Sequence, residues 1–195
     1  MYRIDDIGWL HPARHCPSPN FNQRPPHCAI DLLVIHNISL PAGQFGTGHI
    51  EALFANCLDC NADPSFADLV DLRVSSHLLI ERDGAVTQFV SLLDRAWHAG
   101  QSQFGERSNC NDFSIGIELE GTDLLPYTDV QYRELTAITK ALLARFPALR
   151  PDAIVGHSDI APGRKTDPGP AFDWGRYRQT LVSGTSQSRS SLIER

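Results

Sequence analysis

The sequence predicts an α/β protein with a mixed central β-sheet flanked by helices, and three features of the chain predict it. Short apolar runs suited to buried strands alternate with segments suited to helices, which is typical of a sheet covered by helices. The turn sequence Arg82-Asp83-Gly84 separates two of the apolar runs, which indicates an antiparallel hairpin. The segment 129–146 repeats apolar residues at spacings of three and four, as an amphipathic helix does.

The expected strands are short, and two of them end in a histidine. The run that begins at Asp31 ends in His36, and the run that begins at Ala153 ends in His157, so each strand brings a polar side chain to the end of an apolar sheet. In the run SIGIEL, alternate side chains face opposite sides, which places Glu118 on the face away from the isoleucines. Strands are expected at 31–36, 74–82, 85–90, 114–119 and 153–157.

The clearest helix is expected over 129–146. Thr128 or Asp129 can cap its N-terminus, and Pro147 stops it. Shorter helices are expected at 49–55 and 172–182, and a loop rich in glycine and proline is expected at 161–170.

The length of 195 residues predicts one domain with a tail at each end. Residues 1–30 are rich in proline, histidine and arginine, which favours an extended N-terminal arm. Residues 31–182 contain all the expected strands and helices, and we expect the main domain there. Residues 183–195 are polar and serine-rich, and we expect a disordered tail there.

The composition excludes several classes of function. A net charge of −6 argues against a protein that binds nucleic acid along its phosphates, and fits a small substrate that is not a polyanion. No run approaches the roughly 20 apolar residues that a membrane span needs. The first ten residues, MYRIDDIGWL, contain early acids and no apolar core, so they do not resemble a secretory signal. We therefore expect a cytoplasmic monomer with no membrane or nucleic-acid partner.

Five cysteines are present, and two of them, Cys57 and Cys60, form a CxxC pair. A structural zinc site would need a second pair or two histidines at the usual spacing, and none follows. We interpret the pair as two incidental thiols, with a redox function as the alternative that remains open.

Polar residues at the strand ends can form a catalytic zinc site. Two histidines, one carboxylate and an open position are the ligand set of such a site, and His36 and His157 can supply the histidines. Zinc lowers the pKa of bound water from 15.7 to about 7, a carboxylate such as Glu118 can move the proton, and a cation such as Lys165 can stabilise the oxyanion. The carboxylate ligand could be Asp159, Asp167 or Asp173, and purely structural roles for all these residues also remain open.

The same stretches resemble a known family. The sequences LLVIHNISLPAGQFG, RVSSHLLIERDG, RAWHAG, CNDFSIGIELEGTD, YTDVQY and GHSDIAPGRKTDPGP occur in the family's order over most of 31–177. The chain therefore resembles the N-acetylmuramoyl-L-alanine amidases of the type-2 amidase and peptidoglycan-recognition-protein superfamily. The resemblance is greatest to the cytoplasmic branch that acts on 1,6-anhydro-muramyl peptides.

The resemblance implies roles for individual residues. It implies Zn²⁺ bound by His36, His157 and Asp167, with Glu118 as the catalytic base and Lys165 as the oxyanion partner. It also implies four residues around the peptide and sugar: Asn37, Arg73, Trp97 and Ala161.

The implied activity is hydrolysis of the lactyl–L-alanine amide of muropeptides in cell-wall recycling, which in some bacteria also sets inducer levels for β-lactamase expression. One position departs from the branch, which has a basic residue directly before the cysteine of CNDFSIG. Here that residue is Asn109, and Arg107 two positions earlier is a possible substitute.

Alternative interpretations belong to other classes of protein. A module that only binds peptidoglycan would not need all five of the implied metal and catalytic residues. A periplasmic or phage-type amidase would be indicated by a signal peptide or a wall-binding repeat, and we find neither. His77 is expected to be structural or to line the cleft, and His98 to lie near Trp97 in the cleft or in a simple loop.

Overall fold

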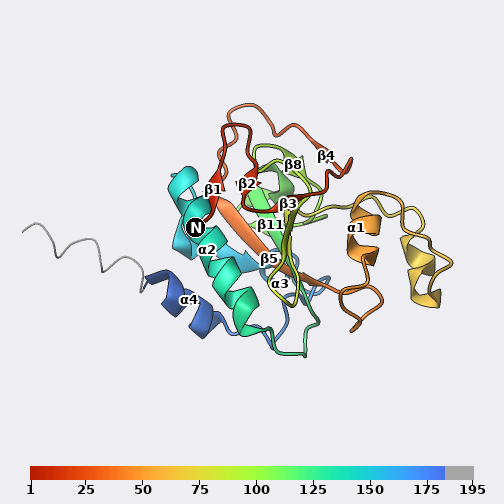
Figure 1. Cartoon of the computed structure of the whole chain (residues 1–195). Helices are drawn as coiled ribbons and strands as arrows, with labels where there is room; N and C mark the ends of the chain where they lie inside the picture. Colours follow the sequence, from red (N-terminus) through yellow and green to blue (C-terminus); the bar gives the residue numbers. More distant parts are fainter. Residues whose placement is uncertain (183–195) are drawn as a thin grey trace, which may run out of the picture.

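The computed structural model describes residues 1–182, and the expected tail at 183–195 lies outside them (Figure 1). The centre is a six-stranded sheet with the order β12-β5-β11-β6-β7-β3. Its strands are β12 (Ile154–Gly156), β5 (Leu32–Ile38), β11 (Ser114–Glu120), β6 (Leu78–Ile80), β7 (Val86–Gln88) and β3 (Arg14–His15).

The central sheet is mixed, as predicted. The neighbouring strands β12, β5, β11 and β6 run parallel, whereas β7 runs antiparallel to β6. The β6–β7 connection is the predicted hairpin, in which Gly84 has φ +90° and its N–H donates to the Glu81 carbonyl at 2.9 Å. A positive φ costs glycine little, which explains its place in this turn.

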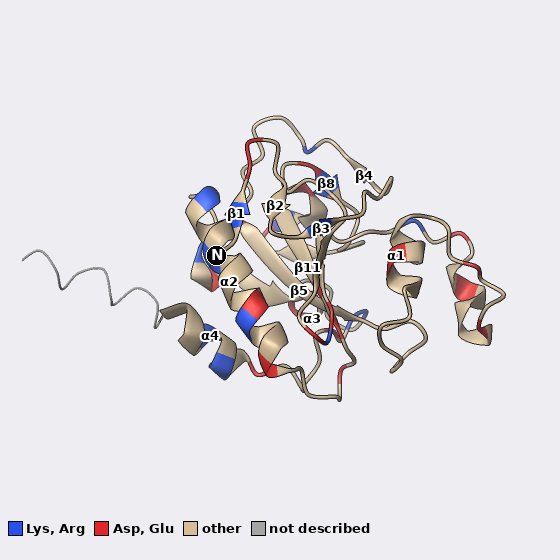
Figure 2. Ribbon diagram, in the orientation of Figure 1, with Lys and Arg blue, Asp and Glu red and all other residues tan. Residues whose placement is uncertain are grey.

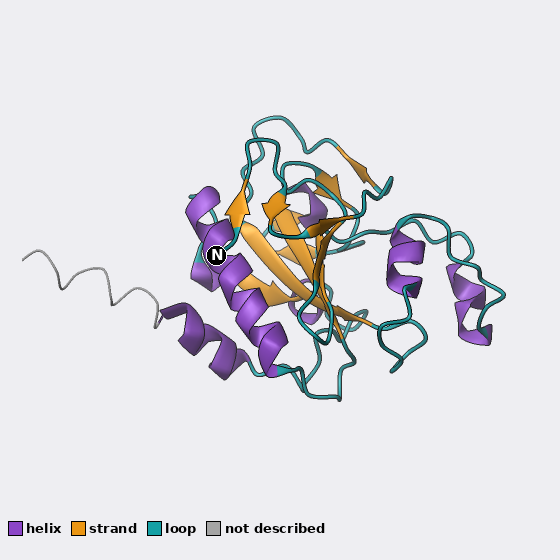
Figure 3. Ribbon diagram, viewed as in Figure 1, coloured by secondary structure: helices purple, strands orange, loops and turns teal. Residues whose placement is uncertain are grey.

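Helices and short strands surround the sheet (Figure 3). The helices are α1 (His49–Phe54), α2 (Asp129–Arg145), α3 (His157–Ile160) and α4 (Trp174–Val182), with 3-10 turns η1 (Pro64–Leu69), η2 (Cys110–Asp112) and η3 (Pro151–Ala153). The peripheral strands are β1 (Arg3–Ile4), β2 (Leu10–His11), β4 (Phe21–Asn22), β8 (Arg95–Ala96), β9 (Gln103–Phe104) and β10 (Arg107–Ser108). No helix among residues 1–182 has the length and apolar character to cross a membrane.

One face of the sheet packs in the apolar core, and the other face carries the polar candidate residues. On one face, Leu33, Ile35 and Ile117 belong to the largest apolar cluster, which also contains residues of α2 and α4. Helix α2 runs along this side of the sheet (Figure 1). The opposite face of β5 carries His36 and that of β11 carries Glu118, because alternate residues of a strand point to opposite sides. β5 contains none of the charged residues coloured in Figure 2, as expected for a strand buried on both faces.

Helix α2 is joined to the sheet at its N-terminus. Thr128 is the N-cap, and its hydroxyl accepts from the Gln131 N–H while the Gln131 side chain accepts from the Thr128 N–H. The Gln131 amide also donates to the carbonyls of Ile80 and Glu120, the last residues of β6 and β11. The predicted helix therefore has the predicted cap, and it ends at Arg145, with Phe146 as the C-cap.

Residues 1–30, expected as an extended arm, contain four two-residue strands and no helix. β3 of this segment is an edge strand of the central sheet and pairs parallel with β7. Leu10 is fully buried, and the Arg24 guanidinium donates to backbone carbonyls that include those of Asn111 and Ser114. The segment therefore packs on the rest of the chain over much of its length.

Three elements differ from the predicted boundaries. The strand expected at 74–82 is confined to β6, because Ser75 instead pairs with the backbone of Trp97 outside the sheet. His157 follows its strand as the first residue of α3 and does not end β12. The segment after Cys60, for which no helix was predicted, contains the 3-10 turn η1, and the Asp63 carboxylate caps it by accepting from the Ser65 N–H.

We predict that Thr128→Ala lowers the free energy of unfolding by about 1–2 kcal/mol, because the variant loses the cap and a hydrogen bond to the Arg82 carbonyl. Thr128→Ser keeps the hydroxyl and should stay close to the parent. Urea unfolding followed by circular dichroism measures both, and equal stability of the two variants would contradict the assigned cap.

Candidate active site

Parallel pairing brings three predicted site residues to one edge of the sheet. Glu118 lies opposite His36 in the register of β11 and β5, and Gly156 lies opposite Ile35 in that of β12 and β5. His157 directly follows Gly156, so it emerges beside His36. Because the carboxyl ends of parallel strands meet at one edge, this sheet order places all three side chains together.

Asp167 reaches the two histidines from the loop after α3. The Asp167 carbonyl accepts from the Ser158 N–H at 2.9 Å, and the Tyr127 hydroxyl donates to the Pro168 carbonyl at 2.8 Å, which tethers the loop on both sides. A Cβ on Gly156 would stand 2.8 Å from Pro168, so the loop approaches the strand this closely only because residue 156 is a glycine.

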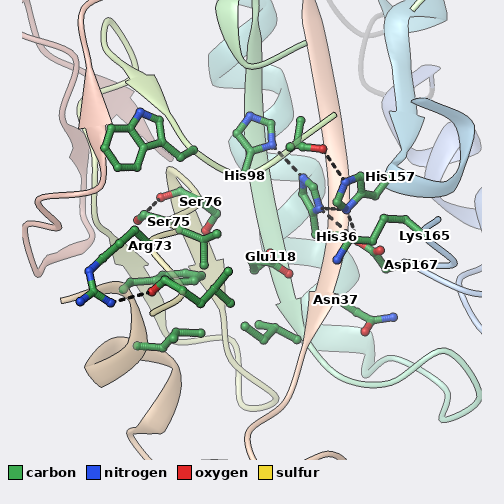
Figure 4. Close-up of a pocket in the computed structure, with 18 of the residues that line it drawn as sticks. His36, Asn37, Arg73, Ser75, Ser76, His98, Glu118, His157, Lys165 and Asp167 are labelled. Atoms are coloured by element: carbon green, nitrogen blue, oxygen red, sulfur yellow. Dashed lines mark hydrogen bonds and ion pairs between the residues drawn. The ribbon is translucent and has the colours of Figure 1, made fainter. Parts of the chain in front are cut away.

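Three potential ligand atoms form a small triangle (Figure 4). Nδ1 of His36 lies 3.0 Å from Nδ1 of His157, and Oδ2 of Asp167 lies 3.1 Å from each of them. Ligands of a tetrahedral zinc ion lie about 3.3 Å apart, because their bonds to the metal are about 2.0–2.2 Å long. Among residues 1–182 this is the group of histidine and acidic side chains whose geometry could hold a metal. The donor set therefore fits zinc.

The outer nitrogens of the two histidines have partners of their own. Nε2 of His157 lies 3.1 Å from the Ala99 carbonyl, which can only accept, so this nitrogen carries the hydrogen. Nε2 of His36 lies 2.9 Å from Nδ1 of His98. A neutral His157 therefore directs a bare Nδ1 lone pair into the triangle, which is the form that binds a metal.

The electrostatics of the triangle favour a cation. Burial lowers the pKa of His36 to about 4, so this ring is neutral near pH 7. Burial raises the pKa of Asp167, but the close contacts of its carboxylate with the His157 and His36 rings outweigh it, so the pKa lies well below its usual value. The ionised Asp167 carboxylate and the neutral His36 imidazole therefore present electron pairs to the same point.

Glu118 is a buried carboxyl group at the same site. Its side chain lines the cavity, and Oε2 has no hydrogen-bond partner among the described residues. Burial raises the pKa of Glu118 well above its usual value, Asp167 raises it further, and Lys165 opposes both. A carboxyl group beside a cavity, with a raised pKa and an oxygen that has no hydrogen-bond partner, is suited to take up and return a proton.

Lys165 lies at the rim, exposed, on the loop that also carries Asp167. The backbone N–H groups of Arg164 and Lys165 both donate to the Ala161 carbonyl, which forms a tight turn after α3. This turn holds Lys165 beside Asp167, in the position predicted for a cation near the ligands (Figure 4).

The site lies in a cavity of about 450 Å³. A second, more open hollow of about 610 Å³ adjoins it and shares Asn37, Lys165 and Asp167 with it. Of the ligand triangle, Asp167 lines both hollows, whereas His36 and His157 line only the first. One wall of the cavity is apolar and consists of Leu40, Leu53, Phe54, Leu69, Leu72 and Val74.

Three of the four residues expected around the substrate line this cavity: Asn37, Arg73 and Trp97. Ala161 is buried and does not line either hollow; its backbone holds the turn that carries Lys165. Arg107, considered as a substitute for a basic residue at position 109, pairs with Asp31 at 2.9 and 3.0 Å. It therefore points away from the cavity.

The other candidate residues have structural partners. The Asp159 carboxylate accepts from the Gly156 N–H, and the Asp173 carboxylate accepts from the Arg176 N–H, so neither reaches the triangle. His77 is buried, and its Nδ1 accepts from the Gly116 N–H. Cys57 and Cys60 are free thiols outside the lining of the cavity.

Sequence reasoning missed three residues that shape the site. The Asn111 amide oxygen accepts from the N–H groups of His98 and Ala99 and so holds the loop beside the ligands. Ser114 lies 3.1 Å from the His98 ring, and Arg164 donates to the Ala99 carbonyl at 2.7 Å. The alternation in SIGIELE, which places Ser114 on the same face as Glu118, could have revealed the serine.

Comparisons with known proteins agree with this geometry. A sequence profile of the family described as N-acetylmuramoyl-L-alanine amidase matches residues 23–170. A protein of Escherichia coli K12 named 1,6-anhydro-N-acetylmuramyl-L-alanine amidase AmpD is 57% identical over 176 residues, 90% of this chain and 95% of that protein. The protein of the same name from Citrobacter freundii is 57% identical over 181 residues, 93% of this chain and 96% of its own length.

Solved structures extend the comparison to the fold. A crystal structure of a selenomethionine derivative of AmpD matches with a TM-score of 0.88 and 56% identity, covering 90% of this chain and 98% of that one. The amidase AmiD of Escherichia coli, solved with the substrate anhydro-N-acetylmuramic acid-L-Ala-D-gamma-Glu-L-Lys, matches with a TM-score of 0.58 and 29% identity. That match covers 91% of this chain and 65% of AmiD.

We predict that the metal-free protein loses stability as the pH falls from about 6.5 to 5. Burial lowers the pKa of His36 to about 4 and of His77 to about 3, and it also lowers that of His98. The unfolded chain can bind a proton at each of these three histidines that the folded chain excludes, whereas the raised pKa of Glu118 favours one proton on the folded side. A net difference of two protons gives a slope of at most about 2.7 kcal/mol per pH unit.

Urea unfolding of chelator-treated protein at pH 7, 6 and 5 measures this slope. A free energy of unfolding that stays constant over this range would show that these buried histidines are not held neutral by the fold.

Proposed function

The chain belongs to the N-acetylmuramoyl-L-alanine amidase family, and from this membership we propose that it hydrolyses the lactyl–L-alanine amide of 1,6-anhydro-N-acetylmuramyl peptides with a bound zinc ion. The substrate class follows the names of relatives that are 57% identical over nearly the whole chain. Release of the stem peptide from anhydro-muropeptides is a step of cell-wall recycling.

The observation that carries the zinc proposal is the convergence of His36, His157 and Asp167. Three electron-pair donors lie within 3.1 Å of one another, and the outer nitrogen of His157 already uses its hydrogen on a carbonyl. Two imidazoles and a carboxylate suit zinc, with a fourth position left for water or substrate. We propose these three residues as the zinc ligands.

Zinc, when bound, supplies a lowered pKa for the attacking water and polarises the amide carbonyl. Glu118 takes the proton of the attacking water, because its side chain lines the cavity and one of its oxygens has no other hydrogen-bond partner among the described residues. The same carboxyl group then gives the proton to the departing amine of L-alanine. Lys165 stabilises the negative charge of the tetrahedral oxyanion from the rim.

Substrate binding is proposed for the residues that line the two hollows. Asn37 lies where they meet, and Arg73 and Trp97 line the first. With the amide bond at the ligand triangle, we propose that the two hollows accommodate the muramyl group and the stem peptide. Ala161 contributes by holding the turn of Lys165.

The cellular setting and the functional unit are also proposals. The five cysteines are free, which fits a reducing compartment such as the cytoplasm. Every proposed ligand and catalytic group comes from one chain, so a monomer suffices for activity. We propose 31–182 as the amidase domain, with residues 1–30 packed on it.

We predict that Asp167→Ala loses bound zinc and amidase activity, because two neutral imidazoles alone bind the ion weakly. Elemental analysis and release of free peptide from anhydro-muramyl tripeptide, with and without a chelator, measure the two properties. Asp159→Asn is the matched control, since it keeps an acceptor for the Gly156 N–H and should keep about one zinc ion per chain. Full zinc content in Asp167→Ala would mean that another carboxylate is the ligand.

We predict that Glu118→Gln keeps its zinc but loses about 10²- to 10⁴-fold in kcat, the usual contribution of a general base. Glu120→Gln is the matched control on the same face of β11, because Glu120 bonds to backbone N–H groups away from the cavity. The control should retain activity. If Glu118→Gln and Glu120→Gln are equally active, Glu118 is not the base. A parent protein that binds zinc but cleaves no substrate would instead be a binding module.

A further inference from the structure

His98 lies between a proposed zinc ligand and the polar face of β11 (Figure 4). Its Nδ1 is 2.9 Å from Nε2 of His36, and its Nε2 is 3.1 Å from the hydroxyl of Ser114. A Cβ on Gly116 would stand 2.5 Å from the ring, so β11 leaves space for the imidazole by having a glycine at this position. The His98 ring therefore packs against β11 at a position where a larger residue than glycine would collide with it.

The hydrogens of this chain of contacts have one consistent arrangement. The Ser114 hydroxyl lies 2.6 Å from the Cys110 carbonyl, and a carbonyl can only accept, so the serine uses its single hydrogen there. Ser114 must then accept from His98, which places the hydrogen of His98 on Nε2. The remaining nitrogen of a neutral His98, Nδ1, can accept only from Nε2–H of His36.

We propose that His98 is a positioning residue that holds His36 in the tautomer with a bare Nδ1 directed at the zinc site, and thereby strengthens zinc binding. The inference rests on the zinc site of the proposed function. His98 does not itself belong to the ligand triangle, because its Nδ1 is occupied by His36. It acts on the metal only through His36.

One loop performs this task for both histidine ligands. The loop places the His98 ring against His36 and the neighbouring Ala99 carbonyl against Nε2 of His157. The Asn111 amide oxygen accepts from the N–H groups of His98 and Ala99, so a single side chain holds the backbone of this loop beside the two histidine ligands. The tautomers of the two rings are thus fixed from the same stretch of backbone.

The first experiment reads the tautomer of His36 without any metal. Long-range ¹H–¹⁵N spectra of chelator-treated, ¹⁵N-labelled protein distinguish a hydrogen on Nδ1 from one on Nε2. We expect Nε2–H at His36 in the parent protein and a mixture of tautomers in His98→Leu. In His98→Asn the side-chain oxygen can take the place of Nδ1 as the acceptor, so the parent tautomer should be largely restored.

The second experiment measures zinc affinity by competition with a chromophoric chelator. We expect about a 10- to 100-fold weaker affinity for His98→Leu, and recovery of most of that loss in His98→Asn. Ser114→Ala keeps both imidazole rings and removes only the hydroxyl that accepts from His98. It should therefore also weaken zinc binding, by a smaller factor than His98→Leu. Ser102→Ala removes a buried hydroxyl that bonds to the Cys110 N–H but not to His98, and should bind zinc like the parent.

The outcomes separate the two proposals. An unchanged His36 tautomer together with parent-like zinc affinity in His98→Leu and Ser114→Ala would overturn the role of His98. Equal losses in His98→Leu, His98→Asn and Ser102→Ala would also overturn it, because they would reflect general loosening of the fold. A parent protein that binds no zinc, but whose His36 tautomer responds to His98→Leu, would leave the positioning role intact and overturn the proposed zinc site.

Discussion

The structure depends on one electrostatic constraint, the convergence of three electron-pair donors on a single point. Two imidazole nitrogens and a carboxylate oxygen lie within 3.1 Å of each other at a largely buried position. Polar groups that converge in this way destabilise a fold unless a positive charge lies between them. The surrounding sheet, loop and hydrogen bonds can be understood as the framework that keeps this arrangement intact.

Strand register supplies most of that framework. Parallel pairing of β12, β5 and β11 aligns the two histidines and Glu118 at one edge. The same strands bury their other face against α2 and α4, so apolar packing holds the polar edge rigid. The Gln131 amide, which bonds to the ends of β6 and β11, ties the helix layer directly to the strands beside the site.

Much of this could be predicted from the sequence, because the informative signals are local. Alternation in SIGIEL, a histidine at the end of each of two apolar runs, and the threonine before α2 each predicted a feature that the structure contains. The loop of His98 could not be predicted in the same way, since its position depends on Asn111 from another segment. The edge strand β3 was missed because two residues are too short for a period to appear.

Arg24 gives the N-terminal segment a further significance. Its guanidinium is largely enclosed and donates to the carbonyls of Asn111, Asp112, Leu92 and Ser114, so it spans the segments on which the His98 loop rests. The stretch before β5 therefore supports the loop that lies beside the proposed zinc ligands. In a chimera between related enzymes, this segment and the loop would have to come from the same parent, because each is shaped to the other.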